Sequence, residues 1–152
     1  MGTPSESTNP IPSGPIMGTF NPANKRAEID AVEKAVLEAV AKFGYPDASR
    51  FALRIALEES MVNAFLHGHR GLPEETTIEV QYRVTNDDVT VQITDQGPGF
   101  NPTNVPNPTD DENLELPSGR GLMLIQAYMS EVRHELDGRR IVMVYTRPSE
   151  GG

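Results

Sequence analysis

Three polar side chains suited to metal and proton binding recur at every fourth position near the middle of the chain. They are Glu59, Asn63 and His67, within the run E-E-S-M-V-N-A-F-L-H-G that begins at Glu58. In a helix this spacing stacks them on one face, with about 6 Å of axial rise between Glu59 and Asn63. We expect both to border the apolar stripe of their helix, where a carboxylate and an amide need polar partners.

A hard cation bound together with nucleotide phosphates would be such a partner. Mg2+ takes oxygen ligands and keeps several waters, so the Asn63 amide oxygen could be one direct ligand. The Glu59 carboxylate, one turn away, could hold a metal-bound water or take a proton from an attacking hydroxyl. The same spacing also fits a simple hydrogen-bonded pair at a helix edge, and the motif alone leaves that alternative open.

A second motif, D-x-G-x-G, follows the end of an expected strand. Asp95 closes the strand, and Gly97 and Gly99 come after it. A carboxylate in that position can accept a hydrogen bond from the amino group of adenine, and glycines let the backbone approach a flat base. An ordinary Asp/Gly turn is the alternative.

A third motif, G-x-G-L, opens an expected helix. It consists of Gly119, Arg120, Gly121 and Leu122. Glycine-rich backbone at a helix N-terminus presents unpaired N–H groups and the positive end of the helix dipole, which suit phosphates. Arg120 could add a charge-assisted contact to a phosphate, or it could be an ordinary solvated side chain.

Two helices are expected around the first motif. Residues 25–43 carry apolar residues at spacings of three and four and end at Gly44. Residues 48–67 form the second helix, which carries Glu59 and Asn63. The apolar spacing predicts that the buried face of this second helix consists of Phe51, Ile55, Val62 and Leu66.

Alternation of apolar and polar residues predicts the strands. Residues 76–85 and 89–95 alternate with a period of two, and the tight turn between them makes the pair antiparallel. A helix over 119–130 and a hairpin made of 131–136 and 139–146 complete the order. The mixture predicts an α+β fold, a two-layer sandwich in which about three helices cover a mostly antiparallel sheet.

Composition separates an N-terminal arm from the folded domain. Residues 1–24 are rich in Pro, Ser, Thr, Gly and Asn, which predicts a flexible arm. A short edge strand could still form within it, at Ile16, Met17 and Phe20.

The folded domain is expected over residues 25–147, with a polar tail over 148–152. Inside the domain, residues 96–118 are proline-rich and acidic. Loops longer than about 12 to 15 residues in a compact domain are usually functional lids or linkers, so we predict a lid here.

Charge and composition narrow the classes of partner. The net charge is −9, with 22 acidic and 13 basic residues, which argues against nucleic acid. Without cysteine there is no thiolate metal site, and the chain shows neither a signal peptide nor an apolar run of about 18 residues. We therefore expect a cytoplasmic protein without a membrane segment. His67 and His69 are expected to cap the helix or pack against the lid, not to bind zinc.

Together the three motifs resemble the N box, G1 box and G2 box of the GHKL ATPases, a superfamily that includes gyrase, Hsp90, MutL, histidine kinases and anti-sigma-factor serine kinases. The patterns are E-x-x-x-N-A-x-x-H-G, D-x-G-x-G-F and G-x-G-L. The resemblance implies a Bergerat-type ATP-binding fold with ATP and Mg2+ as ligands. It implies that Glu59 is the general base, Asn63 the Mg2+ ligand and Asp95 the adenine contact. The nucleotide-binding loop roles fall to Gly97, Gly99, Gly119, Arg120, Gly121 and Leu122.

Within the superfamily, the chain looks most like the compact anti-sigma-factor kinases. The segments that carry this likeness are E-S-M-V-N-A-F-L-H-G and G-R-G-L-M-L-I-Q-A-Y-M-S-E-V. Such kinases bind ATP-Mg, sequester a sigma factor and phosphorylate a serine or threonine of an anti-sigma-factor antagonist. The resemblance implies those partners and leaves a homodimer open.

Three other functions stay open at this point. One is an ATP-dependent adaptor protein without phosphotransfer. Another is the stand-alone catalytic domain of a two-component histidine kinase, and the third is a structural domain that binds no nucleotide.

Overall fold

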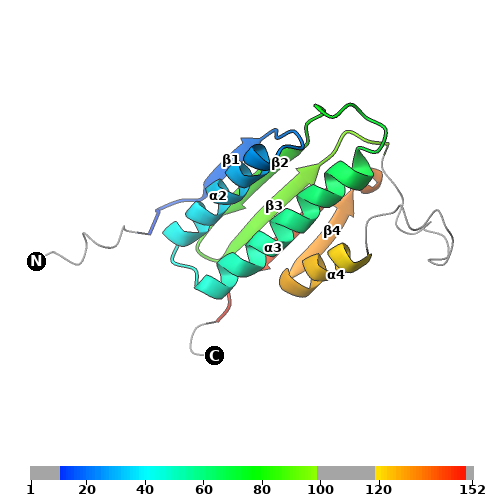
Figure 1. The fold of residues 1–152 in the computed structure, drawn as a ribbon. Coiled ribbons are helices and arrows are strands. Elements are labelled where there is room, and N and C mark those ends of the chain that lie inside the picture. The colour runs from blue at the N-terminus through cyan, green and yellow to red at the C-terminus, as the bar shows by residue number, and fades with distance from the viewer. Residues whose placement is uncertain (1–10, 99–118, 150–152) are drawn as a thin grey trace, which may run out of the picture.

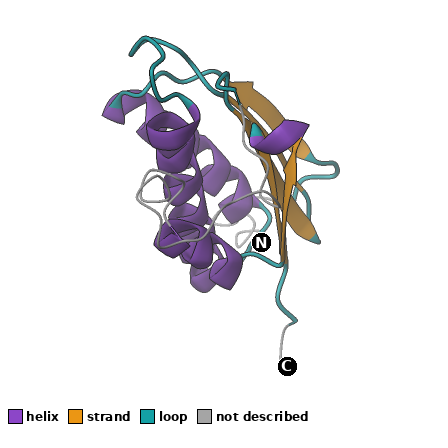
Figure 2. Ribbon diagram, turned by 90° about the vertical axis from the view of Figure 1, so that its right-hand side faces the viewer, coloured by secondary structure: helices purple, strands orange, loops and turns teal. Residues whose placement is uncertain are grey.

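The computed structural model describes residues 11–98 and 119–149. Five strands form one antiparallel sheet in the order β1-β2-β3-β5-β4. The strands are β1 (Ile16–Phe20), β2 (Glu79–Val84), β3 (Asp88–Thr94), β4 (Glu131–Glu135) and β5 (Arg140–Thr146). The helices are α2 (Arg26–Lys42), α3 (Asp47–Asn63) and α4 (Gly119–Tyr128). They cover one face of the sheet, which confirms the predicted two-layer α+β sandwich (Figures 1 and 2).

The central strands have one buried face each, as their alternation predicts. In β3, Val89, Val91 and Ile93 are buried and alternate with half-buried polar residues. The hairpin from β2 to β3 is closed by Thr85, whose hydroxyl oxygen accepts hydrogen bonds from the N–H groups of Asp87 at 3.1 Å and Asp88 at 3.0 Å. The register then pairs Val80 with Ile93 and Val84 with Val89, so the buried residues of both strands meet the helices.

The edge strand β1 lies inside the stretch 1–24 that composition predicts as a flexible arm. It pairs with β2, and its Phe20 ring stacks on Tyr82 with 6.2 Å between the ring centroids. Ile16 and Phe20 also pack against the core. Apolar residues at alternate positions therefore extend the sheet into residues 16–20 of the predicted arm.

Helix α2 buries the stripe that its spacing predicts. Ile29, Val32, Val36 and Val40 are all buried against the rest of the core. Gly44 follows the helix with a φ of +75°, a left-handed conformation that glycine adopts without a steric penalty.

The predicted buried face of α3 is wrong. Phe51 and Leu66 are 56% and 58% exposed, and Ile55 and Val62 are half-buried. The buried residues of the helix are instead Ser49, Ala52, Leu53, Ala56, Leu57, Ser60 and Met61. Alanine and serine let the helix lie close to its neighbours, but they add little to a hydrophobic pattern. The pattern in the sequence was therefore set by the larger apolar residues on the opposite face of the helix. Phe51 packs its ring edge-on against Tyr128 of α4, with 5.8 Å between centroids.

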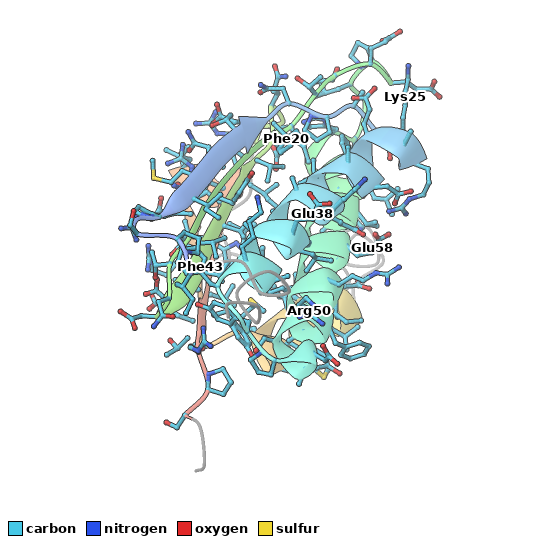
Figure 3. All side chains as sticks on the ribbon, turned by 90° about the vertical axis from the view of Figure 1, so that its left-hand side faces the viewer. Phe20, Lys25, Glu38, Phe43, Arg50 and Glu58 are labelled. Carbon is cyan, nitrogen blue, oxygen red and sulfur yellow. The ribbon has the colours of Figure 1, made fainter. Side chains whose placement is uncertain are left out.

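A charged cluster joins α2 to α3. Arg26 donates two hydrogen bonds to the Glu58 carboxylate, both at 2.8 Å, and one to Asp30 at 2.9 Å. Figure 3 shows Glu58 on α3 beside α2. Glu33 is buried below this pair, and its Oε2 accepts no hydrogen bond from the residues that the structure describes.

The two glutamates of this cluster have opposite pKa shifts. Burial, with a further contribution from the neighbouring Glu58, raises the pKa of Glu33 to about 8. The Arg26 hydrogen bonds lower the pKa of Glu58 to about 2. Glu33 is therefore protonated in the folded protein at neutral pH, while an unfolded glutamate has lost its proton.

We expect Glu33→Gln to stabilise the fold at alkaline pH. Because the folded pKa of Glu33 is raised, its contribution to stability is fully present below the unfolded value of 4.5 and is lost as pH rises toward about 8. The amide cannot ionise, so the unfolding free energy of the variant should fall less than that of the wild type as pH rises from 5 to 8. Urea unfolding at pH 5, 6.5 and 8 measures this. Glu38→Gln, on the exposed side of α2 (Figure 3), is the control, and equal pH dependence in wild type and Glu33→Gln would refute the shift.

No helix within residues 11–98 and 119–149 is long and apolar enough to cross a membrane.

Candidate functional site

The C-terminal end of α3 changes from α-helix to π-helix. Residues Ala64–Gly68 form a π-helical turn, in which the N–H of His69 donates to the carbonyl oxygen of Ala64 at 3.0 Å. Such turns widen a helix locally and occur frequently at functional sites. The turn lies directly after Glu59 and Asn63, both of which are half-buried.

The start of α4 lies against Glu59 and Asn63. A Cβ placed on Gly121 would be 2.9 Å from Glu59 Oε1, 3.3 Å from Asn63 Nδ2 and 3.5 Å from Asn63 Oδ1. Gly121 is buried, and a larger residue there would displace the two polar side chains. The first and third motifs therefore meet, and the N-terminal turn of α4 adjoins a carboxylate and an amide.

The loop after β3 lies against the π-helical turn. A Cβ on Gly97 would be 1.6 Å from the carbonyl oxygen of Gly68, and a Cβ on Gly68 would be 2.3 Å from Asp95 Oδ2. Only glycine permits this approach at both positions. The second motif thus also meets the end of α3.

Asp95 is held in a buried position by its own loop. Its side chain accepts a hydrogen bond from the Gly97 N–H at 2.8 Å, and its N–H donates to the Arg139 carbonyl oxygen at 2.8 Å. The residue is 8% exposed. Burial raises the pKa of the Asp95 carboxyl, while the Gly97 hydrogen bond and the charges of His69 and Arg139 act in the opposite direction. A ligand that donates a hydrogen bond to this carboxylate would compensate for its desolvation.

The predicted site residues thus form two adjoining groups. One group consists of Glu59, Asn63 and Gly121, and the other consists of Asp95 and Gly97. The stretch 59–68 contacts both, because Glu59 and Asn63 lie in it and its last residue, Gly68, lies against Asp95 and Gly97. Gly119 is the first residue of α4, and Leu122 is half-buried against the core.

Some predicted features cannot be placed. Gly99 and residues 99–118 of the predicted lid lie outside the described residues, and so does the side chain of Arg120.

His69 is a residue of the site that sequence reasoning missed. It is 7% exposed, and its Nε2 accepts a hydrogen bond from the Gln96 N–H at 2.9 Å. The pattern H-G-H at the end of the first motif was the available signal. We expected the second histidine of that pattern to cap the helix or pack against the lid, and it contacts Gln96, the first residue of the predicted lid segment, through a hydrogen bond that the pattern did not specify.

The fold agrees with the comparisons to known proteins. The sequence model of the family described as "Histidine kinase-like ATPase domain" matches residues 22–145, so the chain belongs to that family. Membership implies ATP binding. No curated protein matches the chain.

One similar solved structure contains the RsbU and RsbW domains of Rv1364c from Mycobacterium tuberculosis. It shares 18% sequence identity with this chain and superposes with a TM-score of 0.58. The match covers 91% of this chain and 34% of that chain, so this chain spans about a third of its relative. At this identity the likeness is one of fold.

We expect Gly97→Ala to destabilise the protein, because the new methyl group would collide with the Gly68 carbonyl oxygen, which belongs to the backbone and cannot rotate away. Overpacking of this kind costs about 1 to 3 kcal/mol. Urea unfolding measures the loss. Gly14→Ala is the matched control, because nothing lies within 4 Å of the added Cβ. Equal unfolding midpoints for the two variants would contradict the close contact.

Proposed function

We propose that this domain binds ATP with Mg2+ and is a protein serine/threonine kinase that phosphorylates an anti-sigma-factor antagonist. In this proposal it also sequesters a sigma factor, in the cytoplasm of a bacterium. The observation that carries the proposal is the contact of Gly121 with Glu59 and Asn63. It brings the proposed base and the proposed metal ligand beside a helix N-terminus, where phosphates bind favourably.

The adenine would bind at the second group of residues. The buried Asp95 carboxylate would accept a hydrogen bond from the exocyclic amino group. The backbone contact between Gly68 and Gly97 leaves no side chain between the loop and α3 at this point. The family resemblance gives Gly99 a nucleotide-binding role as well.

The phosphates would bind at the start of α4. The residues Gly119 and Gly121 would present backbone N–H groups, and Arg120 would add a positive charge. Leu122 would anchor this turn, since it packs against the core.

The residues fit a magnesium ion that is carried by the nucleotide. The Asn63 amide oxygen is a hard ligand and lies 3.5 Å from the Cβ position of Gly121, at the helix end assigned to the phosphates. Mg2+ is usually bound by one or two protein oxygens together with phosphates and waters. When bound, it would neutralise charge on the phosphates.

The proposed reaction is in-line transfer of the γ-phosphoryl group. The hydroxyl oxygen of the antagonist's serine or threonine forms a bond to the γ-phosphorus, and the bond from that phosphorus to the ADP oxygen breaks. Glu59 takes the hydroxyl proton as general base. The Glu59 carboxylate is half-buried, and its Oε1 faces Gly121 at the phosphate end of the site.

The choice of substrate rests on the sequence. The compact first and third motifs of this chain look most like those of anti-sigma-factor kinases. The likeness to a chain that contains an RsbW domain agrees in fold.

We expect Glu59→Gln to retain ATP binding and to lower phosphotransfer by about 100-fold or more, as is typical for loss of a general base. The amide keeps the shape of the side chain beside Gly121 but cannot take the proton. Incubation of γ-labelled ATP and Mg2+ with anti-sigma-factor antagonists of the source organism measures transfer. Glu38→Gln is the control on an exposed surface.

Each other outcome points to a different function. Wild-type transfer rates in Glu59→Gln would contradict the role of Glu59. ATP binding without transfer by the wild type would favour an adaptor, and acid-labile phosphohistidine would favour a histidine kinase.

A further inference from the structure

His69 follows the π-helical turn at the end of α3, where this segment meets the loop after β3, and both its backbone and its ring form contacts. Its N–H donates to Ala64, and its carbonyl oxygen accepts from the Leu72 N–H at 2.9 Å. Its ring meets the ring of Phe65 edge-on, with 5.8 Å between centroids and an interplanar angle of 77°. These contacts fix the direction in which the imidazole points.

The imidazole is directed at the peptide that follows Asp95. Nε2 accepts the Gln96 N–H at 2.9 Å, and the next N–H along the chain, that of Gly97, donates to Asp95 at 2.8 Å. The Gln96 side chain is exposed and donates to the Thr77 carbonyl oxygen at 2.8 Å. The orientation of the Asp95 carboxylate therefore depends on a turn whose first N–H is held by His69.

We propose that His69 is a positioning residue of the nucleotide site, whose unprotonated Nε2 holds the Gln96 N–H and so fixes the turn that aims Asp95 at the base. The inference rests on the proposed function, because Asp95 is taken there as the adenine contact. His69 touches neither the phosphates nor the reacting hydroxyl in this proposal. It acts through Gln96 and Asp95.

The hydrogen bond requires neutral histidine with its proton on Nδ1. Burial lowers the pKa of His69 below its usual 6.5, against the opposing charge of Asp95. Asp95 is the charged group that faces the ring from the sheet, with Arg139 next to it, and His67 and Arg70 flank the ring along the chain. Above pH 6.5 the bond is intact. Below the lowered pKa, Nε2 would carry a proton, so that two hydrogen-bond donors, Nε2–H and the Gln96 N–H, would face each other and the hydrogen bond would be lost.

The test compares ATP affinity in wild type, His69→Gln and His69→Leu by calorimetric titration at pH 8 and at a pH below the lowered pKa of His69, which nitrogen-15 NMR of the wild type locates. Glutamine can accept the same hydrogen bond and does not titrate, whereas leucine cannot accept it. At pH 8 we expect His69→Gln to bind within a fewfold of wild type and His69→Leu to bind about tenfold more weakly.

The affinity ratio of wild type to His69→Gln should fall by about tenfold between these two pH values. This ratio cancels the titration of the ATP phosphates, which both proteins share. If His69 only filled space, His69→Leu and His69→Gln would bind ATP equally well at pH 8. The affinity ratio of wild type to His69→Gln would then not change with pH.

A second measurement needs no variant and so does not depend on variants that fold. Nitrogen-15 NMR of the wild-type imidazoles at pH 8 should show His69 with its proton on Nδ1 and a bare Nε2. A proton on Nε2 would overturn the inference.

A constant affinity ratio in a wild type that binds ATP would overturn the role of His69 alone. Absence of saturable ATP binding by the wild type at both pH values would overturn the proposed function, and the role of His69 with it.

Discussion

The close approach of two backbone segments, at Gly68 and Gly97, is the constraint on which the site depends. The position for a Cβ on Gly97 is 1.6 Å from the Gly68 carbonyl oxygen, so a side chain there would force the helix layer and the sheet layer apart. The π-helical turn over Ala64–Gly68 carries the end of α3 to this point. Because β3 ends there too, the contact brings Asp95 under the same helix that carries Glu59 and Asn63.

Helix α3 is the common support of the site. Its core side is built from small and apolar residues that face the other helices and the sheet, which leaves Glu59 and Asn63 at the border of the core. Gly121 then lets the N-terminal turn of α4 close on that border. A half-buried carboxylate, an amide oxygen and the N-terminal turn of a helix thus lie side by side, the combination on which the proposed magnesium-nucleotide site rests.

Much of the fold could be predicted from the sequence because several elements have one buried face. The alternation of Val89, Val91 and Ile93 and the stripe of α2 are regular, and both elements lie where they were expected. The buried face of α3 was predicted wrongly, since Ala52, Ala56 and Ser60 pack well without being strongly hydrophobic. Strand β1 was only weakly marked, because Gly18 and Thr19 interrupt its apolar residues.

The motifs of the site could be recognised, but their contacts could not. Glu59 and Asn63 share a helix face by spacing alone, whereas the approach of Gly121 to them is set by how α4 packs on α3. The hydrogen bond from the Gln96 N–H to His69 joins residues that are far apart in the sequence. It depends on the tertiary structure, so no local sequence pattern predicts it. The sequence therefore predicted that His69 caps the helix or packs against the lid, but not which group its ring would bind.

Calorimetric titration of ATP, with and without Mg2+, into wild type and Asp95→Asn is the most direct measurement of whether this junction is a nucleotide site. If asparagine keeps its oxygen toward the Gly97 N–H, its NH2 group faces the base and the acceptor for the adenine amino group is lost. We expect saturable binding by the wild type that Mg2+ strengthens, and binding weaker by about tenfold or more in the variant. Equal affinity in the two proteins would contradict the base pocket, and no binding by the wild type at millimolar ATP would contradict the site as a whole.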